Sequence, residues 1–225
     1  QYKVKIKQQS LYMENSYEII PLFPTPLFIT KLPPSLAQVV PWLDNQPIKP
    51  PTSGRFGQSS ENTYILETKE CEDLKKVILK YATIFGNETL GYKVKEYKFT
   101  QSWISLKYPN QSHDSHTHSN SILSGVFYYG SEYNSNCSVI SFHKSQHNTM
   151  VNSLTPSMDN NSESPFSLNQ TTLKPQPGDL LLFPSYLPHS VPTNTTNRVR
   201  KSLAFNIVPK EGLGEDITLN RLKFN

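Results

Sequence analysis

Apolar positions divide the chain into a helical first third and a β-rich remainder. Between residues 69 and 85 they recur at the 3.6-residue spacing of an amphipathic helix. Thr68 is the expected N-cap and Gly86 the expected stop. The apolar stripe consists of Leu74, Val77, Ile78, Tyr81, Ala82 and Phe85. Such a stripe is typical of a helix that packs on a sheet, so we assign it no chemistry.

The rest of the pattern predicts strands with a little more helix. A strand at 27–31 lies between prolines, which places it at a sheet edge, and a short helix is expected at 35–44. After Gly91 the chain consists of short β runs separated by turns, at 93–99, 102–108, 123–129, 139–142, 180–183 and 201–208. Many short strands after a helical segment indicate a mostly β sandwich or barrel supported by N-terminal helices.

We expect one domain over residues 1–225, because a β architecture of this length commonly forms a single unit. The first methionine is Met13, so residues 1–12 are expected to be a flexible extension. Residues 144–174 are polar and rich in Asn, Ser and Thr, and they are longer than a hairpin connection requires. We interpret them as a polar insertion or a lid over a site.

Composition narrows the functional classes. The net charge of +4 comes from basic residues spread along the chain, so nucleic-acid binding is not expected. Cys71 and Cys137 lie far apart, which argues against a disulfide framework or a Cys-based zinc site. No apolar run approaches the roughly 20 residues of a membrane span, and the first 11 residues are too polar for a signal peptide. We therefore expect a cytoplasmic protein with no membrane partner.

Histidines gather in one short segment. His113, His116 and His118 fall within six positions. Alternate side chains share one face of a strand, so His116 and His118 are expected to point the same way and to chelate one metal ion, although an isolated pair can also lie on a solvated face. Residues 177–184 then predict a turn and an apolar strand that ends shortly before His189. His189 is therefore a candidate third ligand.

Arg200 and Ser202 alternate on one face of the last predicted strand. A guanidinium binds a carboxylate through two parallel charge-assisted hydrogen bonds, and a nearby hydroxyl can donate a third. A metal site together with such a carboxylate clamp is the minimum that a chelating keto acid requires.

Together these segments resemble the jelly-roll oxygenases that depend on 2-oxoglutarate and iron(II), in particular the small members frequent in bacteriophages and marine bacteria. The resemblance covers most of the chain and implies a mostly β double-stranded β-helix, or jelly roll, with supporting N-terminal helices. The segments that carry it are LFPTPL at 22–27, WIS at 103–105, HTH at 116–118, LSGVFYY at 123–129, GDLLLFP at 178–184, HSV at 189–191 and RKSLAFN at 200–206.

The resemblance implies a role for each candidate in the cosubstrate site. His116 and His189 would bind Fe(II), and Arg200, eleven residues after His189, would meet the remote carboxylate of 2-oxoglutarate with the help of Ser202. Tyr128 could hydrogen-bond the cosubstrate, although ordinary packing is the common role of an aromatic residue on a strand.

One position departs from the usual pattern of two histidines and a carboxylate. His118 stands where an acid is expected, but the sub-group that the chain resembles commonly shows His-x-His here, so His118 is the predicted third ligand. Asp114 is its rival, because on a regular strand it would share the face of His116 and His118 and restore the carboxylate.

The implied function is a dioxygenase that uses Fe(II), 2-oxoglutarate and O2, with ascorbate as a candidate reductant. Its substrate is left open between a protein or peptide, including prolyl residues by analogy with the superfamily, and a small molecule. A phage-encoded protein would act in the host cytoplasm. Two other functions fit the same residues: a three-histidine zinc enzyme, and a non-catalytic, cupin-like jelly roll that binds ligands or serves as a structural module.

Overall fold

The computed structural model describes residues 23–50, 57–129, 139–144 and 168–224. The predicted extension at 1–12 and most of the predicted insertion at 144–174 lie outside these residues. The organisation of the chain as one domain stays a prediction.

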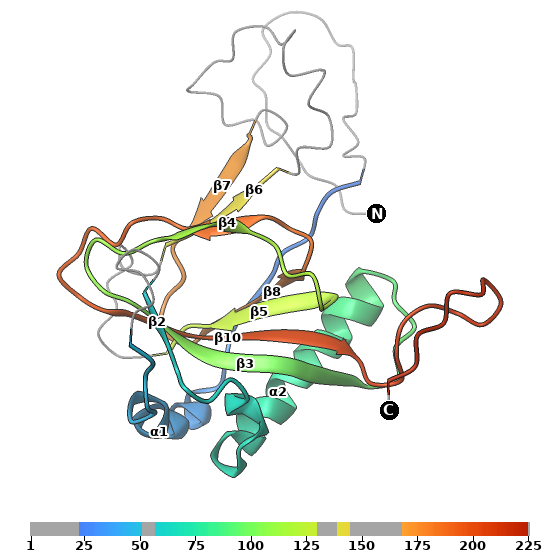
Figure 1. Ribbon diagram of the computed structural model, residues 1–225, viewed down its shortest axis with the longest axis horizontal. Helices are drawn as coiled ribbons and strands as arrows, with labels where there is room; N and C mark the ends of the chain where they lie inside the picture. The colour runs from blue at the N-terminus through green and yellow to red at the C-terminus, as the bar shows by residue number, and fades with distance from the viewer. Residues whose placement is uncertain (1–22, 51–56, 130–138, 145–167, 225) are drawn as a thin grey trace, which may run out of the picture.

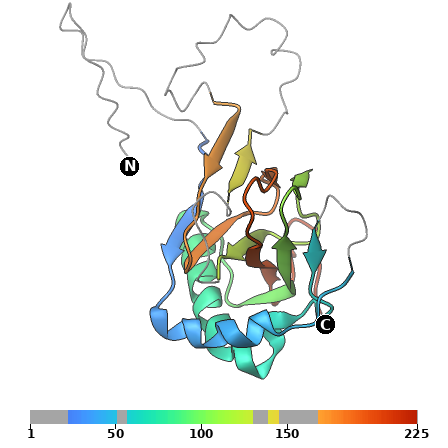
Figure 2. The same cartoon turned by 90° about the vertical axis from the view of Figure 1, so that its left-hand side faces the viewer.

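Two antiparallel sheets form the described structure, and they lie one above the other in Figures 1 and 2. The larger sheet has the order β1-β8-β5-β10-β3-β2, and the smaller sheet has the order β4-β9-β6-β7. The larger sheet consists of β1 (Phe28–Lys31), β2 (Gln58–Ser59), β3 (Tyr97–Lys107), β5 (Leu123–Phe127), β8 (Asp179–Pro184) and β10 (Arg200–Pro209). The smaller sheet consists of β4 (His113–His116), β6 (Ile140–His143), β7 (Gln170–Leu173) and β9 (His189–Val191). The predicted jelly roll is confirmed.

The helices cover the face of the larger sheet that points away from the smaller one (Figure 1). A 3-10 turn, Pro34–Val39, leads into α1 (Val40–Asp44), close to the predicted helix at 35–44. Two further 3-10 turns, Ile65–Glu67 and Lys69–Cys71, precede α2 (Glu72–Thr83), and a π-helix follows at Ile84–Thr89.

The larger sheet is buried on both faces, which explains why β8 is almost continuously apolar. Leu180 and Leu182 belong to a cluster with the helices, whereas Leu181 and Phe183 pack with Phe142 of the smaller sheet. All four of these β8 residues are at most 1% exposed. The second cluster fills the space between the sheets beside the candidate site.

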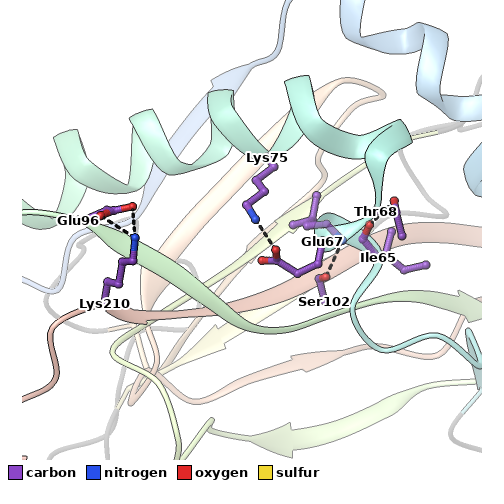
Figure 3. A network of polar contacts seen from close by, with 8 residues as sticks. Ile65, Glu67, Thr68, Lys75, Glu96, Ser102 and Lys210 are labelled. Atoms are coloured by element: carbon purple, nitrogen blue, oxygen red, sulfur yellow. Dashed lines mark hydrogen bonds and ion pairs between the residues drawn. The ribbon is translucent and has the colours of Figure 1, made fainter. Parts of the chain in front are cut away.

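The turn Ile65–Glu67, which precedes α2, holds this helix against β3 (Figure 3). The backbone N–H of Leu66 donates to the buried Oγ of Ser102 at 2.8 Å, and Lys75 pairs with Glu67. Thr68 is the N-cap residue of the turn Lys69–Cys71, as predicted, but its hydroxyl donates to the Ile65 carbonyl at 2.8 Å and makes no side-chain cap. The predicted stop at Gly86 was wrong. Helical structure continues past Gly86, where a Cβ would lie 2.1 Å from the Tyr97 hydroxyl oxygen. Glycine is therefore needed there for close packing and does not end the helix.

The strand predictions were right in the apolar regions and incomplete elsewhere. The runs at 93–99 and 102–108 were predicted as two strands, but β3 is one strand that includes most of both. Its pairing with β10 continues across a register shift between Asn206 and Ile207. Three strands, β2, β7 and β9, were not predicted because each has only two to four residues and lacks a sustained apolar alternation. The strand expected at His116 and His118 exists as β4, but it ends at His116.

Candidate functional site

Three histidines meet at one end of the smaller sheet. His116 is the last residue of β4 and pairs with His189, the first residue of β9, while His118 follows two residues after β4 ends. One ligand nitrogen from each of His116, His118 and His189 lies within 4.8 Å of the other two. The predicted placement of His118 on the strand was wrong, but the turn after β4 brings its ring to the same point.

Hydrogen bonds fix two of the imidazoles in the form that binds a metal. Nδ1 of His189 donates to the Leu187 carbonyl at 3.0 Å, and Nδ1 of His116 donates to the Asp114 carbonyl at 2.8 Å. Because a carbonyl only accepts, each ring carries its proton on Nδ1 and keeps a lone pair on Nε2. Nε2 of His189 lies 3.3 Å from Nε2 of His118.

The donor set fits a divalent transition metal. Two ligands bound at right angles at about 2.1 Å from an ion would lie roughly 3 Å apart, close to the observed distance between the two Nε2 atoms. Burial, opposed by the hydrogen bond to Leu187, lowers the pKa of His189 to about 3, and burial with the nearby His116 lowers the pKa of His118 to about 4. Both rings are therefore neutral donors at neutral pH, as metal binding requires.

Asp114, the alternative third ligand, lies apart from the three histidines. Asp114 is exposed, and its side chain does not belong to the three-histidine group. The expectation that positions 114, 116 and 118 share a face assumed a regular strand, whereas β4 is irregular between His113 and His116. His113 instead stacks on His116, with ring centroids 4.2 Å apart, and lines the adjoining cavity.

Arg200 begins β10 in the larger sheet and is 2% exposed. Its Nη1 donates to the Ser202 hydroxyl at 2.9 Å, and its Nη2 donates to the Tyr128 hydroxyl at 3.1 Å. Its Nε is buried without a hydrogen-bond partner. Among the described residues no carboxylate pairs with this guanidinium, although a buried cation is costly unless it is paired. The arrangement therefore fits a carboxylate supplied by a ligand.

A single cavity joins the two groups. It lies between the sheets, and its lining includes His116, His118, His189, Arg200 and Ser202. Tyr128 reaches Arg200 from behind this lining. The structure thus brings together every predicted site residue except Asp114.

The comparisons with known proteins agree with this geometry. A family described as "Putative 2OG-Fe(II) oxygenase" matches residues 101–206, slightly under half of the chain. The matched segment contains all three clustered histidines together with Tyr128, Arg200 and Ser202. Over residues 101–206 the chain therefore matches the 2-oxoglutarate- and iron(II)-dependent oxygenases. Iron(II) and 2-oxoglutarate are accordingly the cofactors of the oxygenase.

Several solved structures share the fold. A prolyl-4-hydroxylase from Pseudomonas putida is 14% identical, with a TM-score of 0.55. The alignment covers 81% of this chain and 92% of the hydroxylase chain. A 2OG-Fe(II) oxygenase family protein from Burkholderia pseudomallei is 14% identical with a TM-score of 0.54, covering 80% and 84%. The epimerase SnoN, in complex with Fe3+, alpha ketoglutarate and nogalamycin RO, is 12% identical with a TM-score of 0.56, covering 83% and 80%. No curated protein sequence matches the oxygenase.

The family match decides between the functions that the sequence left open. It supports an enzyme that uses iron and 2-oxoglutarate, and neither the zinc enzyme nor the non-catalytic jelly roll has comparable support. Within the described part of the oxygenase, no helix has the length and apolar character needed to cross a membrane.

Proposed function

We propose that this oxygenase is a hydroxylase in which His116, His118 and His189 hold the iron. The proposal rests on one observation: three clustered imidazole nitrogens share a cavity with a buried arginine that has no carboxylate partner among the described residues. A metal and a ligand carboxylate would together satisfy both groups.

The remote carboxylate of 2-oxoglutarate binds at Arg200. The guanidinium is fixed by the hydroxyls of Ser202 and Tyr128, so its remaining donors are oriented before the ligand arrives. The hydroxyl of Ser202 accepts from Arg200 and keeps its own proton for a carboxylate oxygen. This clamp places the keto-acid end of the ligand towards the histidines in the same cavity.

When bound, iron and 2-oxoglutarate would allow O2 to hydroxylate a C–H bond of the substrate. One oxygen atom goes to the substrate and the other to succinate, which forms from 2-oxoglutarate with loss of CO2. The chain supplies binding, orientation and exclusion of water. His116 and His189 are held in one tautomer by backbone carbonyls. Apolar walls that include Phe183 and Val126 surround the polar groups and limit access of water.

Peptidyl proline is the substrate class that we propose first. Two of the similar solved structures are a prolyl-4-hydroxylase and a prolyl hydroxylase in complex with a peptide fragment. A small-molecule substrate is the second candidate, because the similar epimerase SnoN is solved with nogalamycin RO.

The cofactor roles can be tested without a substrate. Fe(II) and 2-oxoglutarate are added to the purified protein without oxygen, and the visible metal-to-ligand band of the chelate is titrated. We expect a band for the wild type, a 10- to 100-fold higher half-saturating concentration of 2-oxoglutarate for Arg200→Met, and no band for His189→Ala. Arg198→Met is the matched control, because Arg198 is exposed and should leave the titration unchanged. A metal-loaded wild type that gives no band would overturn the proposal.

The substrate class needs a separate assay. Proline-containing peptides should stimulate succinate formation and gain one oxygen atom by mass spectrometry, whereas the same peptides with alanine in place of proline should do neither. If turnover of 2-oxoglutarate alone persists and no peptide is modified, the peptidyl assignment is wrong and the small-molecule candidate takes its place.

A further inference from the structure

A second buried cation lies beside Arg200. Lys107 is the last residue of β3, and the register of β3 with β10 places it directly opposite Arg200. The next pair on the same face is Ser105 with Ser202, and both serines line the cavity. Directly paired residues on antiparallel strands have their Cβ atoms roughly 5 Å apart, so the two cationic side chains start from adjacent points on the sheet face that carries Ser105 and Ser202.

Lys107 is only 3% exposed, which is unusual for a lysine. Its Nζ donates to the Ser105 hydroxyl at 3.0 Å, which uses one of its three donors. A Cβ at Gly57 would lie 2.9 Å from this Nζ, so the backbone before β2 packs directly against the lysine. In the described structure no carboxylate pairs with Lys107.

The electrostatics of neighbouring groups connect this charge to the cavity. Burial and the charge of Arg200 lower the pKa of Lys107 to about 8. Burial and His116 lower the pKa of His113 to about 4, and Lys107 and Arg200 contribute to the same shift. Since His113 lines the cavity, both cations act on one face of it. Two buried like charges without an anion are unfavourable, and an anionic ligand would relieve their repulsion.

We propose that Lys107 is a second cation of the cosubstrate pocket and binds the remote carboxylate of 2-oxoglutarate together with Arg200. The inference rests on the proposed function of the Arg200 clamp. Arg200 and Lys107 approach the carboxylate from adjacent strands, so the pocket selects a dicarboxylic keto acid over one with an uncharged tail.

Calorimetry with Mn(II) tests this role without turnover. The binding of 2-oxoglutarate is compared with that of 2-oxopentanoate, which keeps the chelating end and lacks the remote carboxylate. We expect Lys107→Met to weaken 2-oxoglutarate binding about 10- to 100-fold and to change 2-oxopentanoate binding less than about two-fold. Lys107→Arg should restore most of the preference. Lys201→Met is the matched control, because Lys201 lies on the other face of β10 and pairs with Asp44 at 2.7 Å.

The pH dependence of the wild type gives a second readout that needs no variant. The charged or titratable side chains identified around Lys107 in the described structure are Arg200 on β10 and His113 on β4, and Tyr128 after β5 accepts a hydrogen bond from Arg200. His113 is neutral above about pH 4, and burial raises the pKa of Tyr128. Between pH 7 and 9 Lys107 therefore loses its charge, so the preference for 2-oxoglutarate over 2-oxopentanoate should fall as the pH rises. In Lys107→Arg it should stay constant.

The outcomes separate the two proposals. A wild type that binds Mn(II) but neither keto acid would refute the proposed function itself. A wild type that prefers 2-oxoglutarate, with a Lys107→Met variant that shows the same preference within two-fold, would overturn only the role of Lys107. If Lys107→Met does not fold, a wild-type preference that is constant between pH 7 and 9 would overturn it equally.

Discussion

At the scale of single residues, His118 as the proposed third ligand would give the site an unusual charge. A carboxylate usually accompanies two histidines in iron oxygenases of this type, and it cancels one of the two positive charges of the metal. The imidazole of His118 is neutral at neutral pH, because its pKa is lowered to about 4 by burial and by His116. With Arg200 and Lys107 close by, we expect the site to favour a dianionic cosubstrate more strongly than a site with a carboxylate would.

Replacing His118 with aspartate should therefore separate metal binding from cosubstrate binding. We expect His118→Asp to keep Mn(II) affinity within about ten-fold of the wild type, because a carboxylate is also a ligand for such ions. The affinity for 2-oxoglutarate should fall about ten-fold, because a negative charge is added close to the ligand. Both constants can be measured by calorimetry.

Two controls identify the third ligand. His118→Leu should weaken Mn(II) binding about 100-fold, and Asp114→Asn should leave it unchanged, since Asp114 lies outside the histidine group. The reverse result would make Asp114 the ligand and His118 a neighbour.

At the scale of elements, β3 connects the helical layer to the site. Its face towards the helices carries Ser102, which accepts from Leu66, and its other face carries Ser105 and Lys107. The strand pairs with β10 over almost its whole length. A change on the helix side should therefore affect stability without altering the ligands of the cavity.

Ser102→Ala tests this division of roles. The substitution leaves the buried N–H of Leu66 without an acceptor, which should lower the free energy of unfolding by about 1–3 kcal/mol. Urea unfolding measures the loss, and 2-oxoglutarate affinity should be unchanged. Thr100→Ala is the matched control on the same strand, because the Thr100 hydroxyl makes only a 3.5 Å contact with the Asn206 carbonyl. Equal losses for the two variants would contradict the argument.

The sequence predicted those elements whose buried faces show as periodic or continuous apolar residues along the chain. Helix α2 and strands β5, β8 and β10 carry long apolar faces, so their positions followed from the residues alone. The strands β4 and β9 hold the histidines but are short, and their pairing depends on contacts between residues more than 70 positions apart. Lys107 was missed for a similar reason. A lysine at a strand end is usually solvated, and only the structure shows that it is buried opposite Arg200.

At the scale of the whole molecule, the two sheets contribute different halves of the site. The three histidines belong to the smaller sheet or to the turn after β4, whereas Arg200, Ser202 and Tyr128 belong to the larger sheet or follow its strand β5. Phe183 from the larger sheet packs against His189 between them, with ring centroids 4.7 Å apart. A metal alone would therefore stabilise one sheet, and a chelating dicarboxylate would join both sheets.

Stepwise ligand addition should reveal this division in thermal unfolding. A ligand at 100 times its Kd stabilises the folded state by about 2.7 kcal/mol, which corresponds to roughly 5–10 °C in Tm for a chain of this size. We expect Mn(II) to raise the Tm relative to protein with EDTA, and 2-oxoglutarate to add a second increase only when Mn(II) is present. Arg200→Met should keep the first increase and lose most of the second, because it retains the metal ligands and removes the anchor in the larger sheet. His116→Leu should lose both. A full second increase in Arg200→Met would show that the keto acid is held by the smaller sheet alone, and the site would then not bridge the two layers.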